Sequence, residues 1–249
     1  MRGRTHLIAG TMATFEISIL CGLSIVLLTL PVTMICSVIP DIDEANSNTL
    51  SKLISKSITK KIHLALLFSF TALSFYMYMK TGMNAYLGMV LSVLFSILVS
   101  KRLTSSLVRS IVISSLFFIV SLTLYLHKFN LGYSLFALIF AIYPLLKHRG
   151  ISHSLLGSII VFFIFTYIEK SGGPANLAYP ASMAYLIHLV FDMATKRGVP
   201  LLLPFSKRYY RFGNLRVGSI ICNLIENILI ILLAVILVVT LIHSINLKL

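Results

Sequence analysis

Long uninterrupted runs of apolar residues dominate the pattern along the chain. The runs cover residues 7–38, 62–79, 83–100, 107–126, 131–147, 152–169, 178–195 and 219–243. Most of them have the length of about 20 residues with which an α-helix crosses the hydrocarbon core of a bilayer. The pattern therefore predicts an all-α fold, a polytopic bundle of membrane helices.

The first run, residues 7–38, is too long for one crossing. Gly22 and Pro31 interrupt it, and residues of these two types often break a helix. The run continues beyond a signal-peptide core and has no small-residue cleavage site, so we expect it to be retained. We predict a short N-terminal hairpin of two helices that begins and ends on one side of the membrane. About seven further transmembrane helices follow, within a single integral membrane domain that covers residues 1–249.

The composition agrees with a membrane protein and excludes an ordinary soluble domain. The hydrophobic share is 58% and only 11% of residues are charged, whereas about 45–50% of an ordinary domain is apolar. The formal net charge of +14 would suggest nucleic acid as the partner of a soluble protein. Here the cations stand in short loops between apolar runs, so we expect membrane lipids and no nucleic acid as partners. The three cysteines are isolated, which argues against a disulfide framework or a thiolate metal site.

The lysines and arginines divide unequally between the two sides of the predicted topology. Only Lys80, Lys128, Lys170 and Lys248 fall on one side, and the other 17 of the 21 cations fall on the opposite side. Cytoplasmic loops of membrane proteins carry such an excess of positive charge. We therefore predict a multi-pass protein of the cell inner (cytoplasmic) membrane. On this topology, seven polar residues lie near cytoplasmic helix ends, and we expect them to form one site that faces the cytoplasm. They are His6, Asp41, Asp43, His148, His153, His188 and Asp192.

His188 and Asp192 are the most informative pair in the sequence. Their spacing of four residues places both side chains on one face of a helix. An imidazole and a carboxylate suit a divalent metal such as zinc, and one turn of helix lets both reach it. The alternative is a structural hydrogen bond inside the bundle.

His148 and His153 flank an expected break between two apolar runs. Gly150 is expected to end one helix and Ser152 to cap the next, so that both histidines face one pocket. Arg149 between them suits a phosphate or carboxylate, which a guanidinium binds through two parallel hydrogen bonds. A basic loop at the membrane interface is the alternative.

Asp41 and Asp43 follow Pro40, which is expected to end the preceding apolar segment. If these residues are extended, the two carboxylates lie on one side, where they can bridge two cations or combine a ligand with a base. A solvated turn is the alternative. His6 precedes the first hairpin helix and could also be structural. Glu16 lies deep in the apolar layer, where it either stays protonated or pairs with a polar partner such as Glu226 or Asn223.

These motifs together resemble those of a known family. The chain contains Thr5-His6, Pro-Asp-Ile-Asp at 40–43, His-Arg-Gly-Ile-Ser-His-Ser at 148–154 and His-Leu-Val-Phe-Asp at 188–192. In these motifs it resembles the YdjM-like family of inner-membrane, metal-dependent hydrolases, from residue 5 to about residue 226. The resemblance implies a metal site at His6, Asp41, Asp43, His148, His153, His188 and Asp192.

That family is in turn distantly similar to zinc-dependent phospholipase C and the S1/P1 nucleases. Those enzymes are all-helical, hold three zinc ions and use the amino group of an N-terminal Trp as a ligand. This chain contains no Trp, so two ions are expected rather than three.

Together the residues and the resemblance predict a membrane-bound, metal-dependent hydrolase of the phosphoesterase type. Its substrate would be a small-molecule or lipid phosphoester, such as a phospholipid, at the cytoplasmic membrane surface. The expected metal is zinc or manganese. Asp41, Asp43 and Arg149 are the candidate catalytic residues, and Arg149, Lys196 and Arg197 the candidate substrate-binding residues. A cation transporter and a non-catalytic metal-binding membrane protein remain alternatives. A transporter's ligands lie near the midplane of the membrane, and an open coordination position separates an enzyme from a scaffold.

Overall fold

The computed structural model describes residues 1–44, 55–81, 90–91, 93–95, 97–98 and 104–246. Eight α-helices have defined bounds within this part of the chain: α1 (Gly3–Leu20), α2 (Thr29–Cys36), α4 (Lys56–Thr81), α6 (Ser105–Leu126), α7 (Leu131–Ile142), α8 (Leu155–Lys170), α9 (Ala178–Met193) and α10 (Ile220–Asn246). Three short 3-10 helices join them: η1 (Ile39–Asp43), η2 (Tyr143–Leu145) and η3 (Ile151–His153). No strand occurs in these ranges, and the all-α prediction is confirmed for them.

Three helices are long and apolar enough to cross a membrane, counted over the described ranges. The candidate spans are Ser57–Tyr76, Ser105–Leu126 and Ile220–Ser244. The predicted runs 131–147, 152–169 and 178–195 also form helices, but α7, α8 and α9 are shorter than these spans. Most of the run 83–100 lies outside the described residues. The structure therefore supports a helical membrane protein with three candidate spans, and does not confirm the larger number that the sequence predicted.

The N-terminal hairpin is present, although one of its two predicted breaks is wrong. α1 ends at Leu20, and Gly22 turns the chain with a positive φ of 67°, a conformation that glycine adopts without steric cost. Pro31 does not interrupt a helix. It lies in the first turn of α2, where the backbone N–H that proline lacks would have no helical partner. The end of the hairpin packs against α1, because a Cβ atom built on Gly10 would lie 3.0 Å from the Cβ atom of Ser37.

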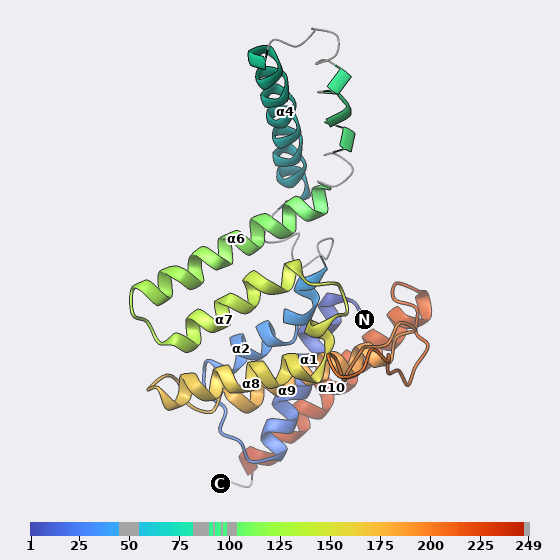
Figure 1. Ribbon diagram of the computed structural model, residues 1–249. Helices are drawn as coiled ribbons and strands as arrows, with labels where there is room; N and C mark the ends of the chain where they lie inside the picture. The colour runs from blue at the N-terminus through green and yellow to red at the C-terminus, as the bar shows by residue number, and fades with distance from the viewer. Residues whose placement is uncertain (45–54, 82–89, 92, 96, 99–103, 247–249) are drawn as a thin grey trace.

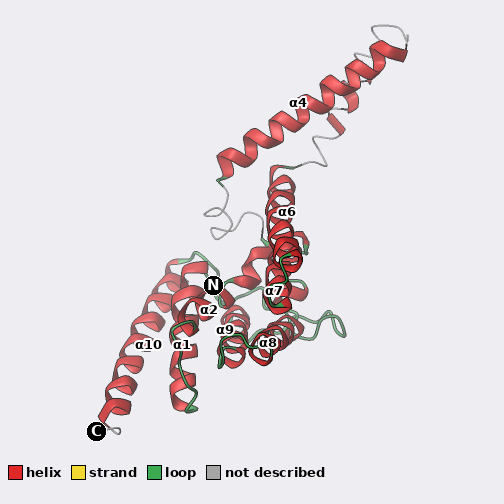
Figure 2. Ribbon diagram, turned by 90° about the vertical axis from the view of Figure 1, so that its left-hand side faces the viewer, coloured by secondary structure: helices red, strands yellow, loops and turns green. Residues whose placement is uncertain are grey.

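The core lies where α2, η1, η2, α8 and α9 meet. Ile39, Val161, Ala181, Ala184 and Tyr185 have no exposed side-chain surface in this cluster. α6 packs along α7, and α4 contacts α6 (Figure 1). α1 lies between α9 and α10 and contacts both, with α10 on the outside (Figure 2). This packing brings the first turn of α1, η1, η3 and the end of α9 together.

The segment between α9 and α10, residues 194–219, folds back beside the end of α9. Val199 and Tyr210 exchange two backbone hydrogen bonds of 3.0 and 2.8 Å, and Lys196 donates to the carbonyl of Leu215 at 3.0 Å. Gly198 has a φ of 65°, and a Cβ atom there would lie 2.5 Å from the carbonyl oxygen of Tyr210. Glycine is therefore required at this position, and the segment has a defined backbone.

Candidate metal centre

Four elements bring the predicted site residues together. His6 comes from the first turn of α1, Asp41 and Asp43 from η1, and His188 and Asp192 from the last two turns of α9. His148 precedes η3, and His153 is its last residue. The prediction that these separated motifs meet in space is confirmed by their contacts.

The local backbone differs from the sequence predictions in two places. Residues 39–43 form a 3-10 helix, so the extended backbone predicted for Asp41 and Asp43 is wrong. Ser152 does not cap the next helix, because α8 begins after Ser154, and the Ser152 hydroxyl instead donates to Asp43. The left-handed residue in the turn is Arg149, with a φ of 57°, rather than Gly150. A side chain that bonds the backbone or a neighbouring acid is an alternative to helix capping that a motif alone does not reveal.

Two histidines and two carboxylates form the centre of the site. The Nε2 atom of His153 lies 3.7 Å from Oδ1 of Asp41 and 3.6 Å from Oδ2 of Asp192. The Nε2 atom of His188 lies 3.7 Å from the same oxygen of Asp41 and 3.9 Å from the same oxygen of Asp192. Each residue thus offers one ligand atom, and all four atoms lie within 4.8 Å of one another.

This arrangement fits a divalent metal. Ligand atoms at the usual zinc distance of about 2.1 Å would be separated by about 3.4 Å in a tetrahedral site. The observed separations of 3.6–3.9 Å are slightly larger. The Nε2 atoms of His153 and His188 are buried without a hydrogen-bond partner in the described part of the protein. Because a buried polar atom without a partner is costly, a bound cation is a natural partner for both nitrogens.

Asp43 contacts the Nδ1 atom of His153, whereas the central group of four ligand atoms includes its Nε2 atom. Its Oδ1 atom lies 2.7 Å from Nδ1 of His148, and its Oδ2 atom 3.1 Å from Nδ1 of His153. Oδ2 also accepts from the hydroxyl of Ser152 and from the backbone N–H of Arg149. Asp43, His148 and His153 form a second group of ligand atoms within 4.8 Å. In the present geometry Asp43 orients His153, whose other nitrogen faces Asp41 and Asp192.

His6 lies at the edge of the centre. Its ring stacks on that of His188 with a centroid distance of 3.8 Å and an interplanar angle of 23°. Its Nε2 atom lies 3.3 Å from Oδ1 of Asp192, the oxygen that also accepts from the amino group of Met1 at 2.6 Å. His6 is completely buried, so it belongs to the site rather than to the membrane interface.

Arg149 is buried against the same carboxylate. Its guanidinium lies 3.0 Å from Oδ2 of Asp192, and it also donates to the hydroxyl of Thr195 and the carbonyl of Gly198. Both terminal nitrogens are thereby engaged, so the guanidinium positions Asp192.

A pocket of about 520 Å³ opens beside the four central residues. Asp41 and Asp192 line it, whereas His153 and His188 lie behind them. The basic residues of the lining outnumber the acidic ones. They are Arg2, Arg149, Lys196, Arg197 and Arg216, against Asp41, Glu44 and Asp192. Such a lining favours an anionic ligand next to the candidate metal ligands.

The charges of the η1 and η3 residues are coupled. Burial opposes ionisation, but the nearby carboxylates of Asp41 and Asp43 raise the pKa of His153 to about 9. Burial also opposes the charge on Asp41, and the neighbouring His188 and His153 hold its pKa well below the usual value. Hydrogen bonds from His148, His153 and Ser152 likewise outweigh burial and lower the pKa of Asp43. The raised pKa of His153 favours the positively charged form of its ring beside the carboxylates of Asp41 and Asp43.

Two sets of supporting contacts were not predicted from the sequence. Tyr185 donates to the carbonyl of Ser152, and its hydroxyl oxygen lies 2.9 Å from that of Tyr143. Glu226 accepts from Arg2 at 2.6 Å and from Thr5 at 2.8 Å. Glu16 has a polar partner as predicted, but this partner is Thr240, which donates to it at 2.7 Å, and neither Glu226 nor Asn223. The only sequence signal for Tyr185 is its position one turn before His188.

Comparison with known proteins gives one family. The family model described as "YdjM inner membrane protein" matches residues 1–247. Over 65 residues the chain is 38% identical to the inner membrane protein YdjM of Escherichia coli (strain K12), and equally to that of Shigella flexneri. The matched segment covers 25% of this chain and 33% of each relative, so the chain matches about a third of the length of these curated relatives. No solved structure matches, and the similarity to phospholipase C and the nucleases stays a prediction.

Proposed function

The chain belongs to the YdjM family of inner membrane proteins, and we propose that it is a metal-dependent hydrolase of phosphoesters. The observation that carries this proposal is the convergence of four ligand atoms, from Asp41, His153, His188 and Asp192, with both Nε2 atoms unpartnered within the described residues. Imidazole and carboxylate ligands suit zinc or manganese. A bound divalent ion would activate water at neutral pH and offset charge on a phosphoryl oxygen.

The second group of ligand atoms supports a two-ion site. Asp43 and His148 offer further ligand atoms beside the central group, whereas His153 would bind only the first ion, through Nε2, because its Nδ1 pairs with Asp43. In this proposal Asp41 and Asp192 hold the first ion on the pocket side. Asp43 either ligates a second ion or orients His153, and in both roles it holds that ring in place.

The cationic lining supports an anionic substrate. Lys196 and Arg197 line the pocket. Neither side chain forms an ion pair within the described ranges. We propose that they bind the phosphate of the substrate, while Arg149 keeps Asp192 in place. The pocket would thus hold a phosphoester next to the ligand group. The excess of positive charge favours a cytoplasmic position for it.

The test combines metal analysis with turnover. The purified protein in lipid nanodiscs should contain bound zinc or manganese, and a panel of lipid and soluble phosphoesters should reveal turnover that a chelator abolishes and added metal restores. Asp41→Asn should lose both metal and turnover. His127→Gln is the matched control, because His127 is an exposed residue at the end of α6 and should change neither.

Fully metallated protein that hydrolyses none of these phosphoesters would contradict the hydrolase proposal. Uptake of the metal into proteoliposomes by the same protein would then favour a transporter. Bound metal without turnover or uptake would favour the remaining alternative, a non-catalytic metal-binding membrane protein.

A further inference from the structure

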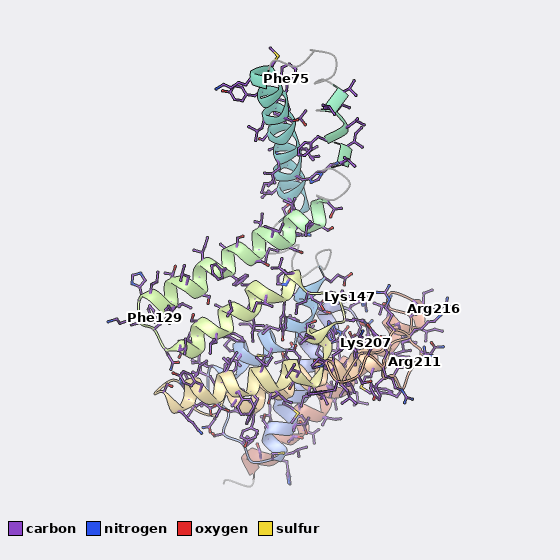
Figure 3. The ribbon with its side chains drawn as sticks, in the orientation of Figure 1. Phe75, Phe129, Lys147, Lys207, Arg211 and Arg216 are labelled. Carbon is purple, nitrogen blue, oxygen red and sulfur yellow. The ribbon has the colours of Figure 1, made fainter. Side chains whose placement is uncertain are left out.

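The segment between α9 and α10 carries positive charge without any compensating acid. Its cations are Lys196, Arg197, Lys207, Arg208, Arg211 and Arg216, and residues 194–219 contain neither Asp nor Glu. They divide into two groups. Lys196, Arg197 and Arg216 line the pocket, whereas the other three, which lie between Arg197 and Arg216 in the sequence, are exposed. Figure 3 shows Lys207, Arg211 and Arg216 on the same side of the molecule.

Large apolar side chains are exposed among these cations. Phe205 is 94% exposed, Phe212 68% and Tyr209 47%. The segment is nevertheless tied to the protein. The hydroxyl of Tyr209 donates to the carbonyl of Arg149 at 3.3 Å, and Arg211 donates to the carbonyl of Lys196 at 2.9 Å. A fixed backbone therefore presents these aromatic rings and cations to the surroundings.

The segment lies directly at the end of a candidate membrane span. α10 begins at Ile220, and Ile220–Ser244 is long and apolar enough to cross a bilayer. Aromatic rings and cations at such a boundary are typical of contacts with lipid headgroups. Anionic headgroups attract clustered Lys and Arg side chains next to a span. Single-stranded nucleic acid could also stack on Phe205 and Phe212, but the position of the segment at the end of an apolar span favours lipid.

We propose that residues 205–212 form a binding surface for anionic phospholipid. Phe205 inserts at the boundary between headgroups and acyl chains, and Lys207, Arg208 and Arg211 contact the lipid phosphates. The pocket cations continue this surface toward the candidate metal ligands, so a bound headgroup could pass from one to the other. This last step rests on the proposed hydrolase function, whereas the lipid binding does not.

The absence of tryptophan from the chain provides a direct test of insertion. Phe205→Trp introduces a single tryptophan, whose emission is excited selectively over that of tyrosine and measured in nanodiscs of phosphatidylglycerol and phosphatidylcholine with brominated acyl chains. We expect blue-shifted emission that brominated lipid quenches. Phe165→Trp, at a position only 4% exposed in the core, is the shielded control. Emission at position 205 that is typical of water and insensitive to bromine would overturn the proposal.

A charge variant tests lipid selectivity. Replacement of Lys207, Arg208 and Arg211 by Gln should lower the preference for phosphatidylglycerol over phosphatidylcholine by about ten- to a hundredfold, measured by native mass spectrometry of the detergent-purified protein. A control variant with Lys60, Lys61 and Lys170 replaced by Gln has the same net charge, and these three residues are exposed on α4 and α8.

The two charge variants give a clear decision. An equal loss of lipid preference in both would overturn the proposal, because only net charge would then matter. Binding of duplex DNA that the first variant loses, with lipid preference unchanged, would also overturn it in favour of nucleic acid. Neither readout depends on turnover, so failure of the hydrolase proposal would be recognised separately.

Discussion

His188 donates from Nδ1 to the carbonyl oxygen of Ser37, over a distance of 2.8 Å. A carbonyl oxygen can only accept, so the proton lies on Nδ1 and the lone pair on Nε2 faces Asp41 and Asp192. Metal-binding histidines commonly have such a partner on the other nitrogen. The contact between the end of α2 and α9 thereby selects the tautomer that a metal requires.

The first prediction concerns His188 and Asp192 themselves. His188→Gln and Asp192→Asn should each lower metal affinity by more than about 100-fold, because each removes a ligand and retains much of the packing. Equilibrium metal titration measures the affinity, and thermal unfolding with chelator present measures the fold. If metal binding persists and only stability falls, the pair is structural and the metal assignment is wrong.

Asp43 should behave differently from Asp41. Asp43→Asn should keep the side-chain size but weaken the orientation of His153, with a loss of about 10- to 100-fold in metal affinity. Asp41→Asn should cost more, because it removes an atom of the central group. Metal titration of both variants gives the ranking. A greater loss from Asp43→Asn would identify Asp43 as a direct ligand.

Tyr185 should stabilise the turn that carries His153. Tyr185→Phe removes the hydrogen bond to the carbonyl of Ser152 and should lower the free energy of unfolding by about 1 kcal/mol. Gly157→Ala should cost more, because its Cβ atom would collide with the Tyr185 hydroxyl. Denaturation of both variants in the same detergent provides the comparison. An unchanged stability in Tyr185→Phe would show that the carbonyl needs no partner.

Metal binding should release a proton from His153 near neutral pH. Its pKa is raised to about 9 without metal, and a metal binds only the deprotonated ring. Affinity should therefore rise about tenfold per pH unit from neutrality and level off above pH 9. The contribution of His153 to the stability of the metal-free protein has the opposite sign. It is present below pH 6.5 and is lost as the pH rises through about 9. Calorimetry in buffers of different ionisation enthalpy measures the released protons. A heat that is independent of the buffer would contradict this assignment.

The sidedness of the site can be tested by topology. Reporter fusions after residues 55, 104 and 205 should report the cytoplasm, and fusions at 129 and 173 the opposite side, because the first three follow cation-rich loops. A fusion at residue 81 should also report the side opposite the cytoplasm. An external reporter at residue 205 would place the pocket outside the cytoplasm.

The sequence predicts the helices well because each long apolar run needs internal hydrogen bonds in a lipid environment, and a helix provides them. The meeting of His6, Asp41, His153 and Asp192 was also predictable, because buried ionisable residues at helix ends rarely stand alone. Local backbone was harder to predict. The choice between a 3-10 turn and an extended segment at 39–43 depends on hydrogen bonds that Asp43 makes with residues more than 100 positions away. The role of Tyr185 likewise depends on a contact across 33 residues.

The bonds of Arg2 and Thr5 to Glu226 join the first turn of α1, which carries His6, to α10. The start of the chain also contacts α9, because Met1 and His6 both lie against Asp192. A ribosome synthesises Asp192 before Glu226, so a nascent chain that has emerged only through α9 contains every candidate ligand but lacks one of the two attachments of this turn. We therefore expect the first turn of α1 to reach its final position only after α10 has been synthesised.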